Sequence, residues 1–219
     1  ATGFVIGLAG AMKYTGIQLV SVLLFAHWLL QYKTDFRWRS AFLSPHLLLS
    51  VAMIPTGFVV GAPVVLSSWQ EMLRRMGRLA EYGRLGYHDF LLDPQGGWIF
   101  YLKTLAWGAG WLMFVAFFVV LVLVLIYRFP EDFVLLVFPL LLYATMGYQK
   151  MFFARFILPA LPPLILLVAA WIERLSRLNQ KLIPAVSSGA ALAVSAILVV
   201  SQPLAMSVWF GVVLHRPDT

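Results

Sequence analysis

The chain has 219 residues, of which 62% are hydrophobic and 11% charged, whereas soluble domains average about 45–50% apolar and about 25% charged residues. This composition excludes an ordinary soluble domain and predicts a polytopic membrane protein, and the absence of cysteine excludes disulfides and thiolate metal sites. We interpret the net charge of +7 as a signal of topology and of contact with anionic lipid, not of nucleic-acid binding.

The first apolar segment, Gly3 to Met12, is shorter than the roughly 20 apolar residues that a membrane span needs. Gly3, Gly7 and Gly10 stand three to four residues apart, which predicts a small-residue packing face on this helix. Because the chain opens inside this apolar run, we expect residues 1–219 to be a single transmembrane domain from a longer protein.

The next apolar runs predict membrane spans joined by short loops. Tyr14 to Leu30 forms the first span, and three basic residues crowd the connection that follows it. By the positive-inside rule this loop is cytoplasmic, in agreement with a second basic loop at residues 173–181. The remaining runs are Ala41 to Val60, Trp98 to Trp107 and Trp111 to Tyr127 around a Gly108-Ala109-Gly110 joint, Phe133 to Tyr148, Phe156 to Ile172 and Ile183 to Val213. We therefore expect an all-α bundle of about six membrane segments.

Residues 64–97 form the longest polar stretch, and by alternation of the spans they form an extracytoplasmic loop. Trp69 to Tyr82 carries apolar side chains on one side, which is the pattern of an amphipathic helix in the membrane interface. The other side is charged, with Glu71, Arg74, Arg75 and Arg78. These arginines oppose the assigned topology, but the two short basic loops agree with each other and decide it.

Candidate polar groups for chemistry cluster in the same loop. Arg84, His88, Asp89 and Asp93 fall within ten residues, and a carboxylate beside a histidine can act as a base or orient a sugar hydroxyl. A solvated loop of ordinary polar residues explains the same pattern. The aromatic ring of Tyr101, nearby in sequence, fits either a sugar-stacking face or the interfacial aromatic belt. No metal site is predicted, because the histidines within the spans lack a second ligand at helical spacing.

The stretch from Lys150 to Pro163 sets two cations, Lys150 and Arg155, where one apolar segment ends and another begins. One interpretation is that both are interfacial anchors whose stems snorkel to the headgroups. The other is that they face a cavity and neutralise a lipid-linked phosphate. Prolines at positions 159, 162 and 163 predict that the first turns of the following helix are broken or kinked.

Several short motifs, taken in order, resemble those of GT-C membrane glycosyltransferases of the family 39 type. This class contains the protein O-mannosyltransferases and the bacterial aminoarabinose transferases. The motifs are Gly7-Leu8-Ala9 with Lys13-Tyr14-Thr15, Gly61-Ala62-Pro63, Gly96-Gly97-Trp98-Ile99-Phe100-Tyr101-Leu102, and Phe153-Ala154-Arg155-Phe156-Ile157-Leu158-Pro159-Ala160-Leu161-Pro162. The family carries threonine where this chain has Met12.

The resemblance implies an enzyme of the bacterial inner membrane that moves a sugar from a polyprenyl-phosphate donor to a protein, lipid or glycan hydroxyl. It implies that the catalytic carboxylates lie in a loop upstream of Ala1, so the catalytic residue is unknown and Asp89 is a weak substitute. Lys150 and Arg155, with Lys13 as a helper, are then expected to hold the lipid phosphate. Arg84, His88 and Tyr101 are the expected contacts of acceptor or sugar.

No cofactor is assigned, and the resemblance leaves open a divalent metal in the parent enzyme. Two other classes of function compete with the enzyme. A transporter or flippase for a lipid-linked glycan would use the same cations to guide a phosphate without chemistry, and a helix bundle that scaffolds another subunit would need fewer charges at membrane depth. The order of the motifs favours the enzyme over both.

Overall fold

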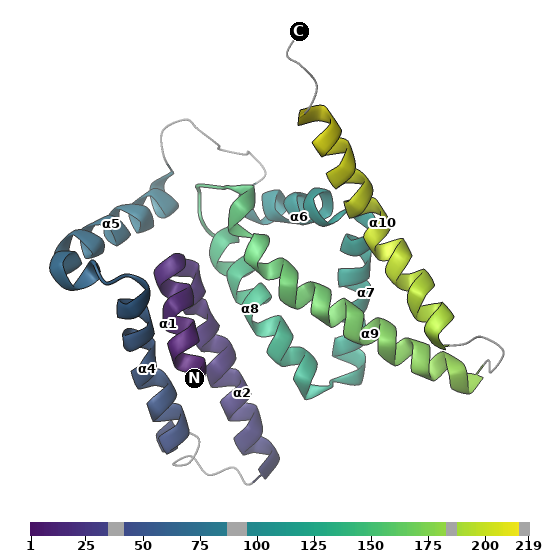
Figure 1. Ribbon diagram of the computed structural model, residues 1–219, viewed down its shortest axis with the longest axis horizontal. Coiled ribbons are helices and arrows are strands. Elements are labelled where there is room, and N and C mark those ends of the chain that lie inside the picture. Colours follow the sequence, from purple (N-terminus) through teal and green to yellow (C-terminus); the bar gives the residue numbers. More distant parts are fainter. Residues whose placement is uncertain (35–41, 87–95, 183–187, 215–219) are drawn as a thin grey trace.

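The computed structural model describes residues 1–34, 42–86, 96–182 and 188–214. These residues form nine α-helices and three short 3-10 helices, and none of them lies in a β-strand (Figure 1). The predicted all-α class is therefore confirmed for the described part of the chain.

The N-terminal helices pack through glycines. Helix α1 (Thr2–Met12) lies parallel to α4 (Pro45–Gly61), and α2 (Leu19–Thr34) follows a 3-10 helix at Tyr14–Gln18. A Cβ atom added to Gly7 would lie 2.1 Å from the carbonyl oxygen of Ile54, and one on Gly57 would lie 2.0 Å from that of Phe4. Only glycine permits this approach of two backbones, and the small-residue face predicted for α1 is confirmed.

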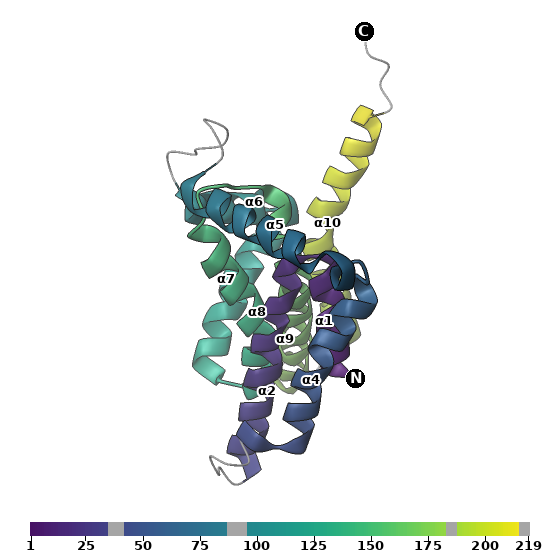
Figure 2. The ribbon, with the colours of Figure 1, turned by 90° about the vertical axis from the view of Figure 1, so that its left-hand side faces the viewer.

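Two sharp bends place helices across one end of the bundle. Helix α5 (Val65–Leu85) leaves α4 at 98°, and α6 (Gly96–Ala109) meets α7 (Trp111–Tyr127) at 118°. The second bend falls at Gly110, whose φ of 85° suits glycine, as the predicted Gly108–Gly110 joint requires. In Figure 2 both α5 and α6 lie across the same end of the molecule.

The C-terminal helices differ in their bounds from the apolar runs. Helix α8 covers Pro130–Gly147, and two 3-10 helices at Ala154–Phe156 and Leu158–Ala160 precede α9 (Leu161–Leu182). The break predicted from the prolines is thus confirmed, while a regular helix from Phe156 is not formed. Helix α10 (Ser188–Leu214) completes the described chain.

Two apolar clusters form the core. The first joins α7, α8 and α9 around Val124, Val168 and Trp171, and the second joins α6 and α8 to the 3-10 segment around Tyr101 and Leu142. Helix α8 contributes buried residues to both clusters and α9 to the first, so these two helices position the residues at their ends.

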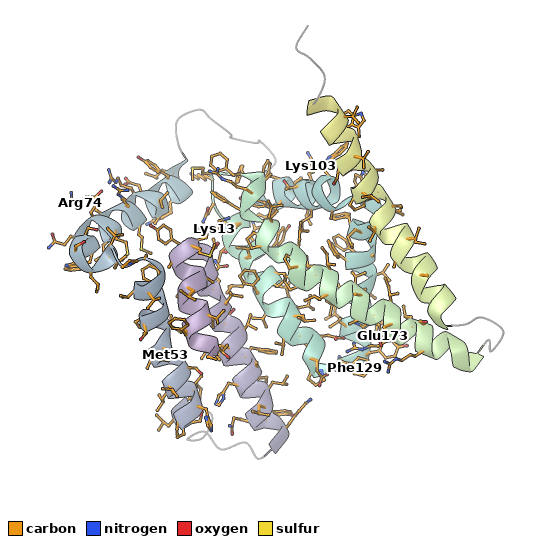
Figure 3. All side chains as sticks on the ribbon, in the orientation of Figure 1. Lys13, Met53, Arg74, Lys103, Phe129 and Glu173 are labelled. Atoms are coloured by element: carbon orange, nitrogen blue, oxygen red, sulfur yellow. The ribbon has the colours of Figure 1, made fainter. Side chains whose placement is uncertain are left out.

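One end of this core carries a buried ion pair. The Asp132 side chain is 1% exposed, and its Oδ2 accepts hydrogen bonds from Trp171 Nε1 at 2.9 Å and Arg174 Nη1 at 2.5 Å. The Arg174 guanidinium also lies 4.6 Å from the centre of the Phe129 ring. Phe129 and the neighbouring Glu173 are labelled at this end of α8 and α9 in Figure 3.

Three helical segments among the described residues are long and apolar enough to cross a membrane, namely Tyr14–Lys33, Pro130–Gly147 and Ala154–Arg177. The number rises to five if each bent pair, α4 with α5 and α6 with α7, forms one span. The expected number of about six segments is larger than this range and stays a prediction.

Candidate anion site

Lys13 is positioned by the break between α1 and the 3-10 helix that follows it. The backbone of Lys13 is extended, with φ of −153° and ψ of 127°, so α1 ends here and the chain changes direction at this residue. The ammonium Nζ donates a hydrogen bond of 3.2 Å to the backbone carbonyl of Arg155, 142 residues further along the chain. Figure 3 labels Lys13 at the end of α1 opposite to Phe129 and Glu173.

Arg155 comes to the same place from the short 3-10 helix before α9. Its guanidinium carbon lies 4.8 Å from the centre of the Phe153 ring and 5.7 Å from that of Phe156. The Lys13 ammonium lies 5.3 Å from the same Phe156 ring. Two cations therefore lie near the Phe156 ring, and each of them gains some cation–π attraction.

No carboxylate offsets these charges within the described part of the chain. Neither Lys13 nor Arg155 forms an ion pair there. Partial burial, and after it the charge of Arg155, lower the pKa of Lys13 from its ordinary value. Two uncompensated cations held together in this way favour the binding of an anion.

A pocket of about 300 Å³ opens beside Lys13. Helix α5 supplies one wall of the pocket, and the segment that follows α8 supplies another. The lining residues are Lys13, Tyr14, Thr15, Met76, Leu79, Ala80, Met146, Gln149, Met151 and Phe156. The pocket thus combines one cation, several hydrogen-bonding groups and an apolar wall, which suits a ligand with an anionic head and an apolar body.

Lys150 helps to hold α5 over this pocket through its backbone. Its amide N–H donates a 2.7 Å hydrogen bond to the carbonyl of Gly83, in the last turn of α5. The Lys150 side chain is exposed, and its ammonium forms no ion pair or cation–π contact within the described residues. The structure therefore brings Lys13 and Arg155 together and leaves Lys150 at the edge of the same region.

The predicted contacts of acceptor or sugar are not gathered at the pocket. Arg84 lies exposed in the last turn of α5, while His88 and Asp89 lie outside the described residues. The ring of Tyr101 is 0% exposed in the second core cluster. Its buried hydroxyl lies near the Phe153 backbone but has no hydrogen-bond partner of ordinary geometry among the described residues. A sugar contact by Tyr101 stays a prediction that its position in the core does not favour.

Two glutamines near the site were not predicted from the sequence. Gln149 lines the pocket, and Gln18 donates from Nε2 to Thr145 Oγ1 at 2.9 Å. The Oε1 atom of Gln18 is buried and has no partner among the described residues. A glutamine within an apolar run was the available signal, because a buried amide needs polar partners.

The candidate site offers no evident metal centre. Among the described residues, no group of three or more His, Asp or Glu side chains could hold a metal ion. The divalent metal that the resemblance leaves open stays a prediction.

The part of the chain that the structure describes is built from helices alone, and several of them could cross a membrane, consistent with an integral membrane protein. Comparisons with protein-family models, with curated proteins and with solved structures find no match to this chain.

Proposed function

We propose that the chain is part of an integral-membrane glycosyltransferase that moves a sugar from a polyprenyl-phosphate donor to a protein, lipid or glycan acceptor outside the cytoplasm. The observation that carries this proposal is the pair of cations, Lys13 and Arg155, that share the Phe156 ring without a carboxylate partner in the described chain. Their position beside a pocket with an apolar wall fits a phosphate joined to a hydrocarbon chain.

In the proposed reaction a carboxylate of the parent enzyme takes the proton of the acceptor hydroxyl. The acceptor oxygen then attacks the anomeric carbon of the sugar, and the bond from that carbon to the phosphate oxygen breaks. The electron pair leaves with the lipid phosphate, whose negative charge increases. Lys13 and Arg155, with Lys150 nearby, stabilise this charge as it develops. Asp89 stays the weak candidate for the base.

The arrangement of the helix ends supports the proposed topology. In Figure 1 the end of α2, the turn between α7 and α8 and the end of α9 lie toward one side of the molecule, and α5 and α6 lie toward the other. We place the first side in the cytoplasm because the connection after α2 and the end of α9 carry more basic than acidic residues. About six membrane segments, an α5 that lies in the outer interface, and location in the bacterial inner membrane complete the proposal.

A binding experiment on this chain tests the phosphate site without requiring catalysis. Farnesyl phosphate is added to the purified protein in detergent, and the midpoint of thermal unfolding is compared with that in farnesol, which has the same chain without the charge. A ligand at about 100 times its Kd stabilises by about 2.7 kcal/mol. We expect a rise of about 5–11 °C for farnesyl phosphate. This rise in the unfolding midpoint should be lost in the double variant that combines Lys13→Met and Arg155→Met.

The matched control is Arg177→Met, which removes an exposed cation from α9 at the opposite end of the molecule and should leave the rise intact. Equal effects of phosphate and alcohol would contradict the phosphate site. Turnover of a radiolabelled polyprenyl-phosphate sugar by the full-length protein then tests the enzyme itself. Unchanged turnover and donor affinity in Lys150→Ala and Arg155→Ala would remove these residues from the proposed mechanism.

The composition of the pocket favours one second candidate function. Its lining contains a cation and hydrogen-bonding side chains but no carboxylate within the described residues, so it offers no base. A transporter or flippase for a lipid-linked glycan would need such a site to hold the phosphate and no group to activate an acceptor. Binding of farnesyl phosphate, combined with a lack of any sugar transfer by the full-length protein, would favour this alternative.

A further inference from the structure

Helix α5 presents an unusual charge cluster on its exposed side. Glu71 Oε1 lies 2.9 Å from Arg75 Nε and 3.3 Å from Arg78 Nη2, and its Oε2 lies 3.5 Å from Arg74 Nη1. Three guanidinium groups therefore share a single carboxylate. Because the arginine side chains are 53–70% exposed, most of their donors remain available to oxygen atoms of a ligand.

The carboxylate arranges the guanidinium groups as well as partly neutralising them. Arg75 and Arg78 both point to the same oxygen, one and two turns after Glu71, so their planes are held close together on the helix surface. Figure 3 shows Arg74 on the outer side of α5, away from α8 and α9. A positive patch of this kind matches phosphate oxygens, to which guanidinium groups bind in a bidentate manner.

The rest of α5 leaves large apolar side chains uncovered by the described protein. Trp69 is 54% exposed and Leu73 50%, and they stand four residues apart on the side opposite to the arginine cluster. Leu79, which is 45% exposed, lies toward the pocket that Lys13 also lines. A helix with exposed apolar side chains on one side and a surplus of cations on the other fits a bilayer surface with anionic headgroups.

We infer that α5 is an anionic-lipid-binding helix, in which Arg74, Arg75 and Arg78 around Glu71 bind phosphodiester headgroups while the apolar side rests in the interface. The occupant is a phospholipid of the bilayer that carries a net negative charge, such as phosphatidylglycerol. The inference goes beyond the proposed function, since it requires only that the protein lies in a membrane and does not depend on sugar transfer.

The absence of cysteine from the chain allows a single-site experiment. Gly77 lies within α5, and a Cβ atom there would meet nothing within 4 Å, so Gly77→Cys accepts a fluorescent label. The labelled full chain is placed in vesicles with about 30% phosphatidylglycerol in phosphatidylcholine, an anionic surface of physiological strength. In one set of vesicles the bromine atoms that quench the label are on phosphatidylglycerol, and in the other an equal amount is on phosphatidylcholine.

We expect brominated phosphatidylglycerol to quench the label at least about threefold more, because each cation near an anionic surface contributes attraction. The ratio should fall to about one in about 1 M salt, where the Debye length is about 3 Å. It should also fall to about one in the variant R74Q/R75Q/R78Q. Glu71→Gln removes the offsetting carboxylate and should raise the ratio.

A label at Gly108 of α6, where a Cβ atom also meets nothing within 4 Å, is the control for general lipid contact. Its quenching should not change in R74Q/R75Q/R78Q, and a change would show that this variant alters the fold. In that case the quenching ratio of Glu71→Gln decides whether α5 binds anionic lipid. Two results would overturn the inference: equal quenching by the two brominated lipids when the arginines are intact, or no rise of the quenching ratio with Glu71→Gln. The arginine cluster would then be assigned to binding of an acidic protein surface.

Discussion

The pair of Asp132 and Arg174 allows a quantitative test of how α8 and α9 are held together. Arg174→Ala leaves the Asp132 carboxylate, 1% exposed, with the Trp171 indole N–H at 2.9 Å as its side-chain donor. Removing one partner of a buried ion pair costs about 3–5 kcal/mol. Because the Arg174 side chain is 32% exposed, we expect the lower limit, about 3 kcal/mol. For a chain of this length that loss lowers the midpoint of thermal unfolding by about 6–12 °C.

The matched control lies one helical turn further along α9. Arg177 pairs with Glu173, and these side chains are 74% and 55% exposed, so Arg177→Ala should cost at most about 1 kcal/mol. Both variants are unfolded thermally in the same detergent and followed by far-UV circular dichroism. Equal shifts for the two arginines would refute the assignment of Asp132 as a buried charge that depends on Arg174.

Three further outcomes test the packing and the electrostatics of other regions. Gly7→Ala places a Cβ atom 2.1 Å from a carbonyl oxygen of α4 and should prevent stable folding, whereas Gly77→Ala in open space should be neutral or stabilise by about 1 kcal/mol. Tyr101→Phe removes a buried hydroxyl that has no hydrogen-bond partner of ordinary geometry among the described residues and should not lower the unfolding midpoint; a loss would indicate that the hydroxyl bonds to the nearby Phe153 backbone, a bound water or a sugar. Burial and the charge of Arg155 lower the pKa of Lys13 in the folded protein. Between that pKa and 10.5 the Lys13 amine is therefore protonated more often in the unfolded chain than in the folded one, and the free energy of unfolding should rise with pH in this range. Lys13→Met should remove the rise, as measured by unfolding midpoints at about pH 8 and about pH 10.

Local features of the fold could be predicted from the sequence where they depend on backbone chemistry. The glycine spacing of α1 predicted its packing face, because the absence of a Cβ atom is a property of the residue itself. The joint at Gly110 and the proline-rich start of α9 follow for the same reason. The bounds of α9 could not be predicted from hydropathy, because hydrogen bonding continues the helix through a charged segment to Leu182.

The candidate site depends on contacts between distant segments, which no local pattern contains. Arg155 was predicted as a phosphate ligand from its own neighbourhood, but its contact with Lys13 spans 142 residues and follows from the packing of α2 and the 3-10 helix Tyr14–Gln18 against α8. Tyr101 was expected either to stack on a sugar or to belong to the interfacial aromatic belt. In the structure, the neighbouring Phe100 and Phe152 rings contact it instead, and it is fully buried.

The two ends of the bundle differ in how their charges are compensated, and this difference bears on function. At one end Lys33 pairs with Glu131 at 2.9 Å and Arg174 pairs with Asp132, so a carboxylate neutralises each of these two cations. At the other end Lys13 and Arg155 repel each other, and this repulsion contributes to the lowered pKa of Lys13. Like charges held together raise the free energy of the folded state unless an anion binds between them. An anionic ligand at that end would therefore stabilise the fold through the same contacts that recognise it.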